Sequence, residues 1–220
     1  MIVPRLDILP PAQQRLWPEL AATPDGFTLY GGTAIALRLA HRSSVDFDFF
    51  SLAPFVPAAL MDTIPYLAGG TVRQSAANTL TATVEREGTV QVSFFGGVRL
   101  GQVAPSEIVE GPGLTVASLL DLAGMKAAVV TQRAEVKDYL DIHALIVQAN
   151  ISLAMMLAAA AAIYGASFNP LISLKAISYH DDPALTALPS AIRQDLIAAV
   201  RGVDVSRLPK LVPLRERISS

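Results

Sequence analysis

The sequence predicts an α+β protein in which a mixed sheet with flanking helices is followed by a C-terminal helical region. Two observations predict this class. Residues 1–110 alternate strand-like and helix-like segments and end in a hairpin pattern, whereas only helical patterns follow Gly111-Pro112-Gly113. We therefore expect two parts: an α/β core at residues 1–110, and a helical region at residues 111–220 that completes a cleft.

The first part begins with a short helix from Pro11, because proline suits a first helical turn. A strand at residues 27–30 stops at Gly31-Gly32, and a helix follows at residues 33–41 with Thr33 as its cap. Further strands are predicted at 45–50, 70–73, 79–85 and 89–95, with a helix near 57–67 and a hairpin turn at Glu87-Gly88. Later helices are predicted at 116–133, 136–148, 152–164, 170–179 and 190–201.

Composition excludes several classes of protein. Of the 220 residues, 52% are hydrophobic and only 16% are charged, so the chain can form a core and is not globally disordered. A net charge of −2 argues against a basic coat for nucleic acid, and the lack of cysteine excludes disulfides and thiolate sites. No apolar run reaches the roughly 20 residues of a bilayer helix, so we expect a cytoplasmic protein without a membrane partner.

Asp46 and Asp48 alternate with phenylalanines along a strand-like segment. Residues i and i+2 of a strand share a face, which sets the two Cα atoms about 7 Å apart. Carboxylate pairs suit Mg²⁺ (or Mn²⁺), which completes its shell with water and substrate phosphates. We expect Asp46 and Asp48 to be catalytic metal ligands, with Phe47, Phe49 and Phe50 anchoring the opposite face. The alternative is an exposed edge strand whose polar face carries two acids.

The turn Gly31-Gly32-Thr33 precedes that strand by one short helix. A strand that ends in two glycines and enters a helix presents backbone N–H groups, which bind phosphate. A Gly-Gly turn is weak evidence alone, since Gly69-Gly70 and Gly96-Gly97 also occur. Its nearness to the acidic strand predicts a nucleotide-phosphate site beside a metal site.

The run GGTAIALRLAHRSSVDFDFFS, residues 31–51, resembles the signature of the AbiEii/AbiGii-type nucleotidyltransferases, within the DNA polymerase β-like nucleotidyltransferase superfamily. The matching residues are Gly31, Gly32, Thr33, Ala34, Leu37, Arg42, Asp46, Phe47, Asp48 and Phe49. A second block, residues 118–142, is similar to the family's Met-Lys followed by Lys-Asp-x-x-Asp. The resemblance covers about residues 27–145 and implies a nucleotidyltransferase fold.

The second block implies functional roles for Lys126, Lys137, Asp138 and Asp141. Lys126 lies on a mostly apolar helix, where an unpaired ammonium is costly, so contact with a triphosphate or with acids would satisfy it. Asp138 and Asp141 share one helical face. We expect Lys126 and Asp138 to be catalytic and Asp141 to support them. The expected nucleotide-binding residues are Gly31, Gly32, Thr33, Arg42, Lys126 and Lys137. A snorkelling Lys126 and a helix-capping Asp138 are the alternatives.

One position departs from the superfamily pattern. Members commonly carry a third carboxylate on a later core strand, and Ser93 stands at the corresponding place in the predicted strand 89–95. Three interpretations stay open: Asp138 replaces that acid, catalysis is slow, or the protein is a degenerate relative.

The predicted function is a metal-dependent nucleotidyltransferase that moves an NMP from an NTP to an acceptor. The resemblance implies a toxin of a toxin–antitoxin or abortive-infection system, with tRNA or another RNA as acceptor and a cognate antitoxin as partner. Two alternatives are a catalytically inactive nucleotide-binding module and a nucleotidyltransferase acting on a small molecule such as an aminoglycoside.

Overall fold

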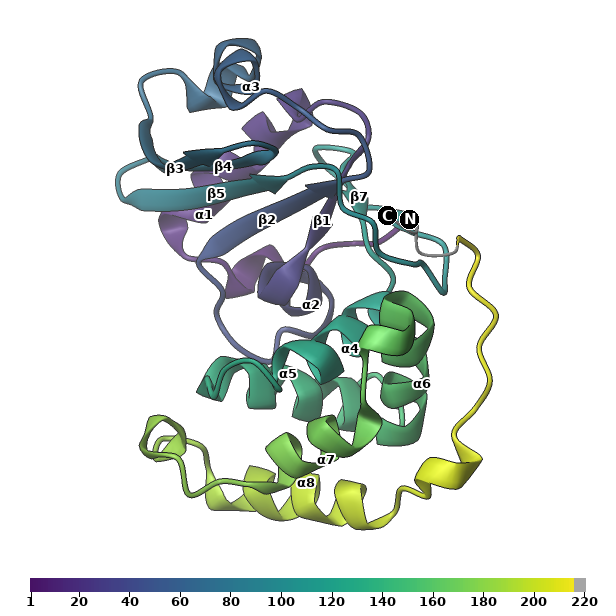
Figure 1. Cartoon of the computed structure of the whole chain (residues 1–220). Coiled ribbons are helices and arrows are strands. Elements are labelled where there is room, and N and C mark those ends of the chain that lie inside the picture. The colour runs from purple at the N-terminus through teal and green to yellow at the C-terminus, as the bar shows by residue number, and fades with distance from the viewer. Residues whose placement is uncertain (216–220) are drawn as a thin grey trace. The chain divides into compact units, whose positions relative to one another are not determined.

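The computed structural model describes residues 1–215 and divides into two compact units (Figure 1). Unit 1 comprises Met1–Arg99 and Ser106–Ala117, and unit 2 comprises Leu100–Pro105 and the chain from Ser118 onward. Unit 1 is built on a sheet with flanking helices, and unit 2 is helical. The predicted α+β class is confirmed.

The strands of unit 1 form one sheet within residues 1–215. Seven strands are hydrogen-bonded in the order β3-β4-β5-β2-β1-β7-β6, so β2 lies in the middle, antiparallel to β1 and parallel to β5. The strands are β1 (Phe27–Tyr30), β2 (Asp46–Ser51), β3 (Thr71–Ala76), β4 (Thr79–Glu85), β5 (Thr89–Phe95), β6 (Glu107–Ile108) and β7 (Thr115–Val116). The helices are α1 (Pro11–Leu16), α2 (Gly31–Leu39) and α3 (Pro57–Thr63), with 3-10 turns at Leu6–Ile8, Trp17–Ala22 and Pro65–Leu67.

Strand β2 places one set of side chains in the core and another on the opposite face. Phe47 and Phe49 are fully buried, and the Phe49 ring stacks on Phe94 with centroids 5.3 Å apart. Phe50 instead lies on the face of the aspartates, where its ring meets Tyr30 at 5.1 Å. The prediction that Phe50 anchors the core face is wrong, because side chains alternate along a strand and Phe50 has the parity of the acids.

Two short strands, β6 and β7, were not predicted from the sequence. Strands β6 and β7 have two residues each, whereas a recognisable strand pattern needs about four to eight. They extend the sheet beyond β1, which pairs in parallel with β7. The helix expected from residue 116 therefore begins later, at Leu119, where the Ser118 hydroxyl caps it by accepting from the Asp121 N–H.

Unit 2 contains five α-helices among the described residues: α4 (Leu119–Val129), α5 (Val136–Val147), α6 (Leu153–Tyr164), α7 (Pro170–Ser178) and α8 (Ser190–Arg201), with 3-10 turns at Gly165–Ser167, Pro183–Leu185 and Val205–Arg207. Helices α4 and α6 lie side by side (Figure 1). Gly124 permits this close contact, since a Cβ there would approach the Ala160 nitrogen to 2.8 Å. Within residues 1–215, no helix combines the length and apolarity needed to cross a membrane.

The alternation along β2 generates a stability test. Phe49→Ala should lower the free energy of unfolding by about 3–5 kcal/mol, because it empties a buried site beside Phe94. Phe50→Ala is the matched control and should cost clearly less, since Phe50 is only half-buried. Guanidinium unfolding followed by circular dichroism measures both. Equal losses would contradict the assigned faces of β2.

Candidate active site

The register of the central strands places an acidic corner at the end of β1. Asp46 and Asp48 lie on one face of β2, and both are half-buried. Tyr30, the last residue of β1, is paired with Asp48, so the chain leaves β1 directly beside the Asp48 carboxylate. Helix α2 starts at the next residue, Gly31. The structure therefore brings the predicted glycine turn and the predicted acids together.

Both glycines lie in close contact with charged side chains. A Cβ at Gly31 would lie 2.7 Å from Asp48 Oδ2, and the backbone of Gly31 has φ +76°. A Cβ at Gly32 would overlap Arg42 Nη2 and would reach within 3.3 Å of Ser44 Oγ. The first turn of α2 thus packs directly against a carboxylate and a guanidinium, and any larger residue would displace them.

Thr33 ties the same turn to the start of β2. Its hydroxyl hydrogen-bonds to the Asp46 carbonyl and, at 2.8 Å, to the Ser44 hydroxyl. The expectation that Thr33 caps the helix is wrong, because α2 begins two residues earlier and no side chain caps it. Helix α2 also ends earlier than predicted, at Leu39, since Ala40 adopts a left-handed conformation with φ +50°. Ser44, which the sequence did not single out, is the buried link.

The first residues of α2 supply N–H groups without helical partners. An α-helix leaves its first N–H groups unpaired within the helix, and the helix dipole adds partial positive charge there. Arg42 contributes a full positive charge beside Gly32, and its Nη1 donates to the Ser43 carbonyl at 2.9 Å. This arrangement favours an anion next to the acidic corner, as a metal-bound phosphate requires.

Ser93 is the neighbour of Asp48 on β5. The parallel register pairs Asp48 with Ser93 and Asp46 with Gln91. The Ser93 side chain is 3% exposed, and its hydroxyl accepts a hydrogen bond from Thr81 at 3.3 Å. A neutral hydroxyl therefore lies beside the acids, at the place where members of the polymerase β-like superfamily commonly carry a third carboxylate.

The corner offers two carboxylates as protein ligands. Among the described residues, no group of three or more His, Asp or Glu side chains is placed to hold a metal. Two carboxylates fit Mg²⁺, which commonly binds one or two of them and takes its other oxygens from water and phosphate. They do not form a self-sufficient cage for a structural ion. Asp46 and Asp48 could hold a divalent cation that is shared with a phosphate-bearing substrate.

A second predicted set lies in unit 2, where Lys126 forms a buried ion cluster. Its Nζ lies 2.6 Å from Asp138 Oδ1 and 2.6 Å from Asp141 Oδ2. Both aspartates on α5 are fully buried, and the Lys126 side chain on α4 is 9% exposed. The 138/141 spacing places both acids on the α5 face that meets α4. The two aspartates provide partners for the Lys126 ammonium without a ligand. The alternative in which Lys126 snorkels to solvent is therefore wrong.

Arg133 completes the cluster and was missed by sequence reasoning. Its Nε donates to Asp138 Oδ2 at 2.9 Å, and its side chain is 44% exposed. Burial by itself raises the pKa of Asp138, but Lys126 and Arg133 outweigh it and hold that pKa below the ordinary value of 3.8. The sequence feature that could have indicated this contact is the position of Arg133 in the turn between two helices, five residues before Asp138.

Lys137 is not part of this cluster. Its side chain is 46% exposed, and its Nζ pairs with Glu135 at 3.0 Å. The predicted residues therefore form two groups. Gly31, Gly32, Thr33, Arg42, Asp46 and Asp48 meet in unit 1, whereas Lys126, Asp138 and Asp141 meet in unit 2.

Comparison with known proteins identifies the family. The model of the family described as nucleotidyl transferase AbiEii toxin, type IV TA system, matches residues 15–209. The chain belongs to this family. AbiEii membership confirms the resemblance drawn from residues 31–51 and 118–142.

One curated protein is similar to part of this AbiEii chain. The uncharacterized protein aq_aa25 of Aquifex aeolicus strain VF5 is 32% identical over 118 residues, which cover 53% of this chain and 55% of that protein. The chain thus matches about half the length of this curated relative.

Two solved structures share the fold. MenT4, a nucleotidyltransferase toxin from Mycobacterium tuberculosis H37Rv, has a TM-score of 0.57 at 15% identity, covering 89% of this chain and 83% of its own. A candidate nucleotidyltransferase from H. pylori has a TM-score of 0.51 at 17% identity, covering 86% of this chain and 90% of its own. Both likenesses support the nucleotidyltransferase fold.

The ion cluster predicts a large stability cost for removing the Lys126 ammonium. Lys126→Met would leave Asp138 and Asp141 buried without their shared partner, which should cost about 3–5 kcal/mol. Lys137→Met is the control; it removes an exposed ion pair and should cost less than about 1 kcal/mol. Urea unfolding of both variants at neutral pH provides the comparison. Similar small losses would show that the buried acids are not held by Lys126.

The lowered pKa of Asp138 predicts acid sensitivity. A carboxylate with a depressed folded-state pKa stabilises the fold above its unfolded value of about 3.8, and this contribution disappears as pH falls through the folded value. The stability gap between wild type and Asp138→Asn should therefore narrow below about pH 4. Urea midpoints from pH 7 downward measure the gap, and a constant gap would refute the assigned ion pairing.

Proposed function

We propose that this AbiEii chain is a metal-dependent nucleotidyltransferase that transfers an NMP from an NTP to an RNA acceptor. The observation that carries the proposal is the contact between the first turn of α2 and the acids of β2, where Gly31 packs against Asp48 and Gly32 against Arg42. A helix start, a guanidinium and two carboxylates at one corner suit a triphosphate and a divalent cation together.

Asp46 and Asp48 would bind Mg²⁺ or Mn²⁺, because their carboxylates share one face of β2. The ion, when bound, neutralises phosphate charge and stabilises the attacking and leaving oxygens. The backbone N–H groups of residues 31–33 would orient the phosphates, and Arg42 would add charge-assisted hydrogen bonds. Buried Phe47 and Phe49 fix the strand, so the carboxylates are held in place before substrate arrives.

In the proposed reaction the acceptor hydroxyl gives its proton to a solvent water, and its oxygen bonds to the α-phosphorus of the NTP. The bond from that phosphorus to the bridging oxygen breaks, and pyrophosphate leaves. Such a transfer depends on positioning and electrostatics and needs no nucleophilic side chain. The neutral Ser93 beside Asp48 is consistent with a reaction in which the strand β5 supplies no base.

For unit 2, we propose that the Lys126–Asp138 pair acts in catalysis, as the family's second motif implies. Lys126 has three N–H donors, of which Asp138 and Asp141 take two, so one donor is left for a substrate phosphate. The exposed part of Arg133 supplies a further cationic contact, and Lys137 lies one residue before Asp138 on α5. Asp141 supports the arrangement by holding Lys126.

The family also supports a biological role. AbiEii membership supports a toxin of a toxin–antitoxin system. We propose that it acts in the cytoplasm and is restrained by a cognate antitoxin. We propose RNA, and tRNA in particular, as the acceptor. A small-molecule acceptor such as an aminoglycoside and an inactive nucleotide-binding module are distinguished from it by the experiment below.

Asp48→Asn should abolish transfer while leaving the fold intact, because it removes one anionic ligand from a half-buried strand position. Purified protein is incubated with each α-labelled NTP, Mg²⁺, and either total tRNA or aminoglycosides. Wild type should label RNA, and the control Asp62→Asn, on an exposed face of α3, should match it.

The other outcomes are decisive as well. Label on the drug would assign a small-molecule acceptor, and no label with any NTP would leave only a binding module. Retained activity in Asp48→Asn, with an unchanged melting temperature, would remove Asp48 from the site. Omission of Mg²⁺ and addition of EDTA should stop transfer, and Mn²⁺ should restore it.

A further inference from the structure

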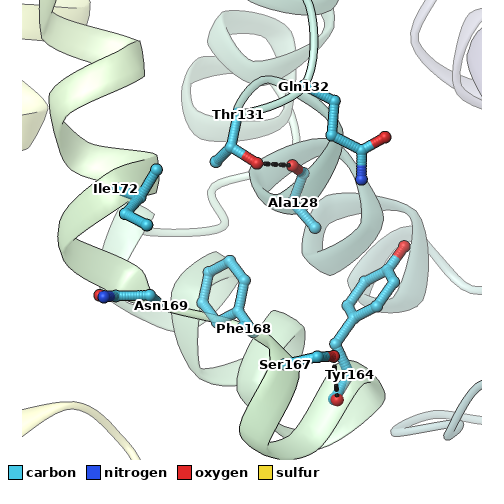
Figure 2. Close-up of a pocket in the computed structure, with 8 residues that line it drawn as sticks. All are labelled: Ala128, Thr131, Gln132, Tyr164, Ser167, Phe168, Asn169 and Ile172. Carbon is cyan, nitrogen blue, oxygen red and sulfur yellow. Dashed lines mark hydrogen bonds between the residues drawn. The ribbon is translucent and has the colours of Figure 1, made fainter.

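Unit 2 contains a pocket with a volume of about 230 Å³ beside the start of α7 (Figure 2). Its walls come from the C-terminal end of α4 and the turn after it, from the segment joining α6 to α7, and from Ile172 on α7. Ligand sites for drug-sized molecules are usually larger, about 300–1,000 Å³. The volume suits a single planar ring system.

The pocket is distinct from the ion cluster on α4. Ala128 lines the pocket, and Lys126 lies two residues earlier. Two residues rotate a helix by about 200°, so these side chains leave α4 on nearly opposite sides. The pocket and the ion cluster are joined through neighbouring residues of the chain. Gln132 lines the pocket, and the next residue, Arg133, binds Asp138 in the cluster.

The pocket wall is polar but uncharged. None of its eight lining residues is charged, which disfavours a phosphate or an ammonium group as the occupant. The Thr131 hydroxyl donates a hydrogen bond to the Ala128 carbonyl at 2.7 Å, and Asn169 Oδ1 accepts one from the Leu171 N–H at 3.0 Å. Within residues 1–215, the Gln132 carboxamide and the Asn169 Nδ2 make no hydrogen bond. These amide groups remain available to a ligand.

Two aromatic rings contribute the apolar part of the wall. Tyr164 ends α6 and Phe168 lies in the short connection between α6 and α7; both are half-buried, and Figure 2 shows the Phe168 ring turned into the pocket. Bases stack on aromatic side chains whatever their sequence, while Asn and Gln amides match the donor–acceptor edges of bases. Aromatic rings and unused carboxamides around a small uncharged space are the components of a base-binding pocket.

We propose that this pocket binds one unpaired nucleobase of the RNA acceptor, stacked on Phe168 and hydrogen-bonded to Gln132. The inference rests on the proposed function for the choice of RNA. The base would lie in the uncharged pocket, and the adjoining phosphate would lie toward Arg133, one residue along the chain. Such a contact holds the acceptor without a strongly basic surface, in accord with a net charge of −2.

The test is equilibrium binding of a fluorescein-labelled single-stranded RNA octamer to the full chain, without NTP or Mg²⁺. Phe168→Ala should weaken binding at least about fivefold, since a stacked base contributes that much or more. Gln132→Ala should weaken it about two- to fivefold, because it removes a hydrogen bond to the base. Leu171→Ala and Gln148→Ala are matched controls: both side chains are exposed in unit 2 and neither lines the pocket. Phe168→Leu, which retains apolar bulk without the ring, should bind like Phe168→Ala and melt like wild type.

Photocrosslinking locates the base independently. An octamer containing 4-thiouridine should crosslink to the peptide that carries Tyr164 and Phe168. Unchanged affinity in both pocket variants, or crosslinks only elsewhere, would overturn the proposal. Displacement of the RNA by free NTP at equal concentration would assign the pocket to the donor nucleotide and would overturn it too. Because no transfer occurs in this assay, its outcome is independent of whether Asp48→Asn abolishes catalysis.

Discussion

The close contact between the first turn of α2 and the start of β2 is the constraint on which the acidic corner depends. Gly31 leaves room for the Asp48 carboxylate, and Gly32 leaves room for the Arg42 guanidinium. Thr33 then fixes the turn to the Asp46 backbone. The left-handed φ favours glycine at position 31, and the lack of a side chain at both positions leaves room for the charged groups where they now lie. The glycine turn and the acidic strand form one packed unit, so a change in either displaces the other.

The ion cluster of unit 2 joins stability to chemistry. Lys126, Asp138 and Asp141 are buried, and a buried charge without a partner is strongly destabilising. Loss of activity in a Lys126 variant could not be assigned to the proposed chemistry alone, because the substitution would also destabilise the fold. The more exposed Arg133 is the better probe, since its guanidinium touches Asp138 while nearly half its side chain faces solvent.

Much of the fold could be predicted from the sequence because β4, β5 and the later helices carry strong periodic patterns. The acidic corner was predicted for a local reason: Gly31-Gly32 and Asp46 are separated by one short helix. The two strands that were not predicted depend on contacts between residues far apart in the sequence. The two-residue strands β6 and β7 exist because β1 offers a free edge, and no local pattern encodes that. The role of Arg133 likewise appears only when the turn after α4 folds back onto Asp138.

Charge balance limits the part that the cluster could take in the proposed phosphate chemistry. Lys126 and Arg133 carry two positive charges, and Asp138 and Asp141 carry two negative charges when ionised, so the cluster is neutral as a whole. An approaching phosphate gains attraction only by sharing a cation with Asp138. Lys126 is enclosed by both acids, whereas the Arg133 side chain is 44% exposed and also meets Glu135 at 3.4 Å. A phosphate in the proposed site would therefore meet Arg133 first, where it competes with Glu135. Lys126 would hold Asp138 ionised and oriented and would offer the phosphate only the one N–H that the two aspartates leave.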